Sequence, residues 1–171
     1  MSGGWAGWIK SDRGLLQVDG PLKAKLLDTS IAEAMAALNC ICYAIGKDMI
    51  REGDVVVLAT DNNNVMDVLT GKARRKFRRK DARKRGWTTK QLRQYLKQSN
   101  EHIDKISTIF EHRMVRTGFD LRWNHVKGHR GKIDRRAAVN HGCDERARSA
   151  MQSERKANRR KKAGPPFGDP A

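Results

Sequence analysis

The chain has few cysteines, few acidic residues for its number of basic ones, and no long apolar run. Its three cysteines, Cys40, Cys42 and Cys143, are an odd number without the spacing of a disulfide framework, so we expect reduced thiols. No segment reads as a membrane span, and the opening MSGGWAGWIK lacks the basic and then apolar pattern of a secretion signal. These absences predict a cytoplasmic protein without membrane contacts.

The shortage of acidic residues is uneven along the chain. There are 36 Lys and Arg against 19 Asp and Glu, which gives a net charge of +17 over 171 residues. Residues 72–85 carry a net charge of +9 and residues 155–162 carry +6, so the remainder of the chain is nearly neutral. A solvated surface normally mixes charges of both signs, whereas concentrated basic blocks favour binding to a polyanion. The charge pattern therefore predicts a nucleic-acid partner.

The first part of the chain predicts a β-hairpin followed by a helix. Strands are expected at residues 5–9 and 15–20, because the SDRG between them has the composition of a tight turn. A helix is expected over residues 30–46, where Ser30 and Glu33 have the spacing of a capping box. The apolar side chains that recur there at helical spacing are Ile31, Met35, Leu38, Cys42 and Ile45.

The rest of the chain alternates between strand and helix patterns. DVVVLAT, residues 54–60, is a continuous apolar run that ends at Asp61, as expected of a strand buried on both faces. Helices are predicted within 63–71 and over 88–117, followed by a half-buried strand at 119–126 and a final helix. This order predicts a mixed α/β domain with its strands in one sheet.

The composition divides the chain into a domain and a tail. We predict one domain over residues 1–153, in which residues 72–118 form a basic, helical protrusion. Residues 154–171 are basic, contain ANRRKKAGPPFGDPA, and lack the apolar side chains needed to pack, so we expect a disordered tail.

Three acidic residues occupy positions that suit a metal site. Glu33 lies one turn into a predicted helix, Asp61 ends a predicted strand, and Asp144 opens the last predicted helix. Ligand sites in α/β sheets gather at the carboxyl ends of strands, and carboxylates brought together there favour a hard cation such as Mg²⁺. Each acid also has a local explanation: helix capping for Glu33, a turn for Asp61, and the helix dipole for Asp144.

A fourth candidate lies where a predicted strand breaks off. In LRWNHVKGHRGKID, residues 121–134, His129 stands between Gly128 and Gly131. The glycines allow a sharp turn, and a histidine in such a loop can carry protons near neutral pH. The stretch has the features of a catalytic loop or of a simple turn.

Four segments together resemble type 1 ribonuclease H. They are, in order, SIAEAMAAL, VVVLATDNNNV, WNHVKGHRG and NHGCDERARSA. The family has a Glu on its first helix, an Asp after its fourth strand, a VKGH loop, and an Asn-x-x-x-Asp helix start. The matching residues are Glu33, Asp61, His129, and Asn140 with Asp144. The opening GGWAGWI resembles the family's second strand and KRGW its basic protrusion, so the resemblance covers residues 3–151.

The resemblance implies a ribonuclease H-like mixed β-sheet flanked by helices, and a metal-dependent endonuclease that cuts the RNA strand of RNA–DNA hybrids. It implies two Mg²⁺ ions, with Mn²⁺ as a substitute, held by Glu33, Asp61 and Asp144. His129 would move a proton or assist product release. The RNA strand would be recognised through its 2′-hydroxyls, and other duplexes could bind the basic segments. The nucleic-acid-binding residues so implied are Asn62, Arg74, Arg75, Lys76, Arg78, Arg79, Lys84, Arg85, Trp87 and Lys127.

One element of the family pattern has no counterpart. The family's first strand, with a catalytic Asp that bridges both metal ions, would precede the start of this sequence, and Asp12 and Asp19 are poorly placed to replace it. The resemblance thus implies a sheet that lacks its first strand. We consider three explanations: a displaced start or clipped chain, a strand supplied by another chain, or an impaired enzyme.

Two rival hypotheses remain open from the sequence. One is a catalytically impaired module that binds nucleic acid without cutting it. The other is a zinc site built from His125, His129, His141 and Cys143, although His125 also fits the buried face of a strand. Trp87, which follows the basic block, is the tryptophan best placed to stack on a base.

Overall fold

The structure is a computed structural model that describes residues 3–22, 28–73, 84–126 and 135–163. It opens with the predicted hairpin, in which β1 (Gly3–Ser11) and β2 (Gly14–Leu22) pair antiparallel, with Ser11 opposite Gly14. Gly14 has φ +134°, a backbone conformation that favours glycine and lets the turn close in two residues.

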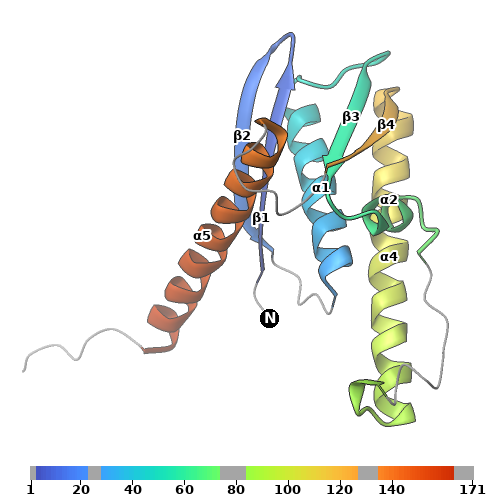
Figure 1. The fold of residues 1–171 in the computed structure, drawn as a ribbon, viewed down its shortest axis with the longest axis vertical. Helices are drawn as coiled ribbons and strands as arrows, with labels where there is room; N and C mark the ends of the chain where they lie inside the picture. The colour runs from blue at the N-terminus through green and yellow to red at the C-terminus, as the bar shows by residue number, and fades with distance from the viewer. Residues whose placement is uncertain (1–2, 23–27, 74–83, 127–134, 164–171) are drawn as a thin grey trace, which may run out of the picture.

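Helix α1 (Thr29–Gly46) follows and is the centre of the core (Figure 1). It begins one residue earlier than predicted, because Asp28 is the N-cap and its Oδ1 accepts a hydrogen bond from the Ser30 N–H at 2.9 Å. The predicted capping box of Ser30 with Glu33 is therefore wrong. The buried side chains of α1 are Ser30, Ile31, Ala34, Ala37, Leu38, Ile41 and Ala44.

The middle of the chain forms a second strand pair covered by helices. Strand β3 (Val55–Thr60) pairs in parallel with β4 (Asp120–His125). In the sequence, the two strands are separated by α2 (Asn64–Leu69) and α4 (Thr89–Thr117). Helix α4 starts with a capping box formed by Thr88 and Gln91 and ends at Gly118, which has φ +72°. The helices and strands predicted in this region are thus present with small shifts in their ends.

The core lies between α1, α2, α4 and one face of the β3–β4 pair. Phe119 of the chain entering β4 is buried, and Leu121 and Trp123 of β4 pack against the same cluster. The largest fully buried hydrophobic side chains are Ile31, Val65, Val68, Leu69, Ile103 and Ile106.

The described strands form two separate pairs, β1–β2 and β3–β4, instead of the single sheet that was predicted. Strand β3 is also covered on one face only: Val55 is 47% exposed and Val57 is 58% exposed. The prediction that this run is buried on both faces is wrong, because no described element covers its second face.

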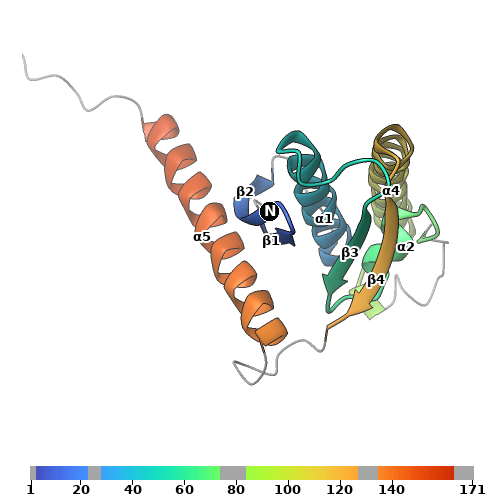
Figure 2. The same ribbon diagram turned by 90° about the horizontal axis from the view of Figure 1, so that it is seen from above.

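Helix α5 (Arg135–Ala163) packs on the hairpin from the side opposite α1, so that β1 and β2 lie between the two helices (Figure 2). A Cβ at Gly4 would lie 1.8 Å from the Ala147 carbonyl oxygen, and one at Gly7 would lie 2.1 Å from Cys40 Sγ. Both glycines are therefore required by the close approach of a helix.

Helix α5 differs from expectation at both ends. It begins nine residues before Asp144, which lies in its third turn instead of opening it. The expected dipole effect on Asp144 is therefore wrong, since that effect is confined to the first turn. Residues 154–163 continue the helix, so the disordered tail predicted from residue 154 is wrong over those residues.

By length and composition alone, Thr29–Gly46 is long and apolar enough to cross a membrane. In this structure the same helix supplies much of the core, and helices buried in a protein core commonly meet both criteria.

Candidate active site

A groove runs between the two strand pairs, with a volume of about 1810 Å³. Strand β1 and the hairpin turn line one side, β3 and Asp61 line the other, and α1 and α5 supply the rest of its lining. Thr60 and Asp61, at the carboxyl end of β3, are part of its lining, and ligand sites in α/β sheets gather at the carboxyl ends of strands.

The three acidic residues predicted to bind metal all line this groove. Glu33 comes from the second turn of α1, Asp61 follows the last residue of β3, and Asp144 comes from α5. Three elements that are distant in sequence thus bring their carboxylates to one cavity.

The electrostatics of Glu33 reflect this convergence. Burial raises the pKa of its carboxyl above the ordinary value of 4.5, and the negative charges of Asp61, Asp144 and Asp28 raise it further. A hydrogen bond from Asn62 acts in the opposite direction. Because Glu33 is electrostatically coupled to the other two acids, a bound cation would relieve repulsion among all three.

Asn62 orders the loop that carries Asp61. Its backbone N–H donates to Thr60 Oγ1 at 3.2 Å, and its Oδ1 accepts from the Asn64 N–H at 2.9 Å. Its side-chain amide donates to Ser30 Oγ at 3.3 Å, which ties the loop to the start of α1. The sequence placed Asn62 among the nucleic-acid ligands, whereas here it also joins the elements that carry Glu33 and Asp61.

The donor types in the groove suit a hard divalent cation, since all three are carboxylates. Within the described ranges, however, no three His, Cys, Asp or Glu side chains lie close enough to hold one ion together. Mg²⁺ is commonly held by one or two carboxylates with waters and substrate phosphates as its other ligands. The carboxylate oxygens are therefore of the donor type that Mg²⁺ prefers, and water or substrate would supply its remaining ligands.

The zinc hypothesis gains no support from the described part of the chain, where no metal-holding cluster of three such residues is present. His125 is exposed at the end of β4, so the interpretation of His125 as a core residue is wrong. His141 lies 3.4 Å from Glu145 on the surface of α5.

Several predicted site residues lie outside the described residues. They are His129, Lys127, Arg74, Arg75, Lys76, Arg78 and Arg79.

The basic segment enters α4 through an aromatic cluster. The Arg85 guanidinium lies over the rings of Trp87 and Tyr95, at 4.9 Å and 5.1 Å from their centres. Trp87 and Tyr95 meet edge to face at 5.1 Å, and Leu92 is buried beside them. Lys84 and Arg85 are exposed while Trp87 is half-buried, so the Trp87 ring already has protein contacts that compete with base stacking.

Tyr95 also connects this cluster to the candidate site, a link that the sequence analysis missed. Its hydroxyl donates to Asp28 Oδ2 at 3.0 Å, while Asp28 Oδ1 caps α1. The signal available in the sequence was Asp28 itself, an Asp two residues before Ser30, which is a common N-cap arrangement.

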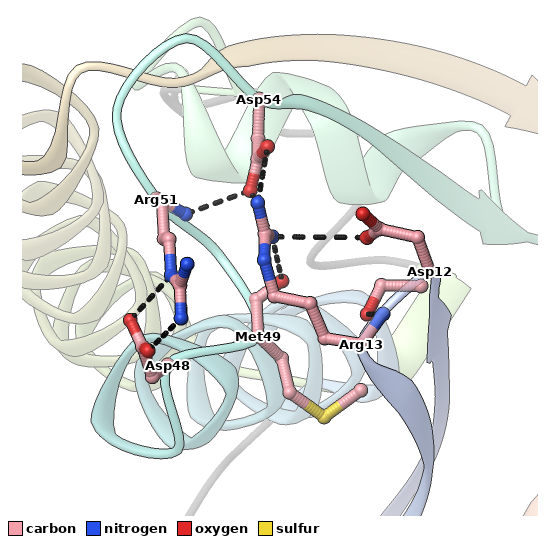
Figure 3. Close-up of polar contacts among 7 residues, drawn as sticks. Asp12, Arg13, Asp48, Met49, Arg51 and Asp54 are labelled. Atoms are coloured by element: carbon pink, nitrogen blue, oxygen red, sulfur yellow. Dashed lines mark hydrogen bonds and ion pairs between the residues drawn. The ribbon is translucent and has the colours of Figure 1, made fainter.

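The other end of the groove is held by ion pairs (Figure 3). Arg13, in the hairpin turn, reaches Asp54, which precedes β3, and also donates to the Met49 carbonyl at 3.3 Å. Hydrogen bonds from the Arg13 guanidinium and the Arg51 backbone N–H lower the pKa of Asp54. Arg51 in turn pairs with Asp48. This polar network was not anticipated from the sequence.

The cysteines are free thiols. Burial raises the pKa of Cys40 to about 12, and burial is also the main cause of a raised pKa at Cys42 and Cys143. Cys40 and Cys143 line the groove, whereas Cys42 does not. Thiolate chemistry at neutral pH is therefore disfavoured at all three.

Comparison with known proteins agrees with the resemblance seen in the sequence. The family model of RNase H matches residues 2–152 of this chain. A search of curated proteins gave no match.

Proposed function

Because the chain belongs to the RNase H family, we propose that it is a metal-dependent endonuclease that cuts the RNA strand of RNA–DNA hybrids. The family is one of nucleases, which makes hydrolysis of a phosphodiester the first expectation. The observation that carries the proposal for this chain is the convergence of Glu33, Asp61 and Asp144 on one groove, with the Glu33 carboxyl coupled to both other acids.

The three carboxylates would hold the divalent metal, with Mg²⁺ the best fit to their oxygen donors. When bound, the metal would lower the pKa of a water and neutralise charge on the phosphate and the leaving oxygen. Before binding, repulsion from Asp61 and Asp144 adds to the cost of ionising Glu33. Metal binding and ionisation of Glu33 are therefore expected to reinforce each other.

The chain's own residues would position these acids. Asn62 hydrogen-bonds the Glu33 carboxyl and also reaches Ser30 at the start of α1. Its other hydrogen bonds fix the turn that presents Asp61. Asn62 is thus proposed as a positioning residue as well as a contact for the hybrid. His129, by its resemblance to the family loop, is proposed to move a proton or assist product release.

The basic segment would bind phosphates of the hybrid. Lys84 and Arg85 are exposed at the entry to α4 and extend the basic run of residues 72–85. The aromatic cluster under Arg85 would hold its guanidinium in place. Affinity that arises from such contacts falls steeply with salt concentration, while discrimination of RNA from DNA would come from 2′-hydroxyls in the hybrid.

A second function is favoured by one observation. No three candidate ligands lie within reach of one ion in the described ranges. Carboxylates that are too far apart to share one ion suit a module that binds hybrids but does not cut them. It predicts salt-dependent binding of the hybrid with no cleavage in Mg²⁺.

The test is cleavage of an end-labelled RNA–DNA hybrid by the full chain, in Mg²⁺, in Mn²⁺ and in EDTA. Asp61→Asn should abolish cleavage. Asp120→Asn is the matched control, because Asp120 lies opposite Val55 at the other end of the β3–β4 pair and is exposed. Binding without cleavage by the unaltered chain would reject the nuclease proposal and favour the binding module. Cleavage that persists in Asp61→Asn would reject the assigned site.

A further inference from the structure

Helix α5 extends beyond the hairpin on which it packs. The backbone of Ala147 and Met151 lies against Gly4 of β1, and partly buried residues recur along α5 as far as Glu154. From residue 155 to residue 158 every side chain is exposed. Figures 1 and 2 both show the carboxyl end of α5 extending past the hairpin and away from α4. The last turns of this helix therefore have no packing partner among the described elements.

The unpacked end of α5 is strongly basic. Residues 155–162 contain six Lys or Arg and no acidic residue, which gives a net charge of +6. The ion pairs among the described side chains lie elsewhere, and Glu154 accepts a hydrogen bond from Asn158 at 3.2 Å. Like charges at helical spacing repel one another, and the helix dipole offsets this only in the last turn. Neither packing nor the helix dipole therefore accounts for the whole run.

Two exposed arginines of α5 lie on the same face of the helix as Asp144. Arg148 and Arg155 follow Asp144 by four and eleven residues, which are close to one and three whole turns. Asp144 lines the groove, so this face runs from the groove to the basic end of the helix. Lys156 is also exposed, but it is turned by about 100° from Arg155 around the helix axis.

The basic end of α5 is separate from the basic surface at the entry to α4. Lys84 and Arg85 are exposed at that entry. In both views the hairpin and α1 lie between α4 and the carboxyl end of α5. A ligand bound to the end of α5 therefore uses a surface that the proposed function has not assigned.

The charge density of this segment matches that of a nucleic-acid duplex. Residues 155–162 span about 12 Å of helix at about 1.5 Å per residue. A duplex carries one negative charge per about 1.7 Å of its axis, so six cations correspond to about seven phosphates over the same length. One strand alone carries about half as many phosphates over that length. The match therefore favours a duplex over a single strand.

We propose that the face of α5 that carries Arg148 and Arg155 binds the phosphates of duplex nucleic acid that extends beyond the groove. Arg155 lies roughly 16 Å along the helix from Asp144, which corresponds to about five base pairs of duplex. DNA duplexes and RNA–DNA hybrids both have these phosphates, so the contact does not depend on the sugar. The match to the RNase H family model ends at residue 152, so Arg155 lies outside it. This surface goes beyond the proposed nuclease activity and is tested without cleavage.

The test is equilibrium binding of the full chain, in EDTA, to a DNA duplex and to an RNA–DNA hybrid of the same length and sequence. Both probes carry fluorescein, and anisotropy is measured over a range of salt concentrations. Arg148→Gln combined with Arg155→Gln should weaken both affinities by the same factor, on the order of tenfold at low salt. The slope of log affinity against log salt should fall by about two, since each phosphate contact contributes about 0.9.

Two control variants separate this contact from a general effect of charge. Lys105→Gln combined with Arg116→Gln removes the same charge from exposed positions on α4, and should leave affinity and slope nearly unchanged, because salt screens distant charges. Lys156→Gln removes a charge next to Arg155 from a different face, and should cost less affinity than Arg155→Gln alone. Circular dichroism checks that each variant keeps its helices.

The outcomes that would overturn the proposal are distinct. Equal losses in the two double variants would show an effect of net charge alone. Equal losses in Arg155→Gln and Lys156→Gln would reject the assigned face, and a loss confined to the hybrid would reject the assignment to phosphates. Unchanged duplex affinity would overturn the proposal, and weaker binding to phosphatidylserine vesicles would then favour a membrane surface. None of these readouts depends on cleavage, so failure of the proposed nuclease activity would leave this test intact.

Discussion

Arg13 and Asp54 form a two-pronged ion pair that ties the hairpin to the β3–β4 pair. The distances are 2.6 Å from Nη1 to Oδ2 and 3.2 Å from Nη2 to Oδ1. The two strand pairs have no ladder of backbone hydrogen bonds between them in the described residues. This side-chain contact therefore helps fix their separation at one end of the groove.

The first prediction concerns how the stabilisation by the Arg13–Asp54 ion pair depends on pH. Arg13 holds the pKa of Asp54 below its ordinary value of 3.8. A lowered folded-state pKa gives stability that is present above about pH 4 and is lost as pH falls through the folded pKa. Asp54→Asn should thus lower Tm slightly at pH 7 and have less effect at pH 3. Thermal melts at both pH values check this, and an equal loss of Tm at pH 3 would show that the charge is not responsible.

Glu33 is predicted to behave in the opposite way, because its pKa is raised. The protonated carboxyl is favoured in the folded state, and that advantage is lost as pH rises through the raised pKa. Glu33→Gln should therefore raise Tm at pH 7, have little effect at pH 3, and abolish hybrid cleavage. Thermal melts and the cleavage assay measure these together. A fall in Tm at pH 7 would show that Glu33 is a structural residue first.

Metal binding should be visible without any substrate. If the groove carboxylates hold Mg²⁺, millimolar Mg²⁺ should raise Tm, since a ligand that binds only the folded state stabilises it. Asp61→Asn should remove most of that shift, while Asp120→Asn should keep it. Differential scanning fluorimetry with a magnesium titration makes the comparison. A shift of equal size in Asp61→Asn would place the ion elsewhere.

The individual helices and strands could be predicted from the sequence, because each depends on a short stretch of neighbouring residues. The hairpin follows from SDRG between two apolar runs, and α4 from Ile103, Ile106 and Phe110 at helical spacing, all of which are buried. The capping of α1 was misassigned, because Ser30 and Glu33 match the capping pattern as well as Asp28 matches an N-cap.

The arrangement of the strands was not predictable in the same way. Val55 and Val57 have the β-branched composition of a doubly buried strand, yet composition does not report whether a second element covers them. The start of α5 was also misplaced, because RRAAVN has little apolar periodicity, and Asp144 was consequently put at a helix end. The convergence of Glu33, Asp61 and Asp144 on one groove could be predicted from their positions on the predicted helices and strand. The family resemblance supported this prediction, because it matched the three residues to the family's acidic residues.

The approach of α1 to the hairpin predicts a steric cost at Gly7. A Cβ there would lie 2.1 Å from Cys40 Sγ, so Gly7→Ala should destabilise the fold by about 1–3 kcal/mol. Cys40→Ala in the same chain should recover part of that loss by removing the sulfur. Gly46→Ala is the control, because nothing lies within 4 Å of its Cβ position and alanine favours a helix. Urea denaturation of the three variants measures the differences, and equal stability of Gly7→Ala and Gly46→Ala would contradict the packing.

The hydrogen bond from Tyr95 to Asp28 predicts a link between the basic segment and α1. Tyr95 is 8% exposed, so Tyr95→Phe should cost about 0.5–1.5 kcal/mol by removing its hydroxyl. Tyr43→Phe is the matched control, because Tyr43 is 41% exposed and should tolerate the change. In a double-mutant cycle with Asp28→Ala, the double variant should lose less stability than the sum of the losses of the two single variants, since both substitutions remove the same contact. Strict additivity in urea denaturation would show that the hydroxyl does not act through Asp28, and α4 would then be joined to the start of α1 by packing alone.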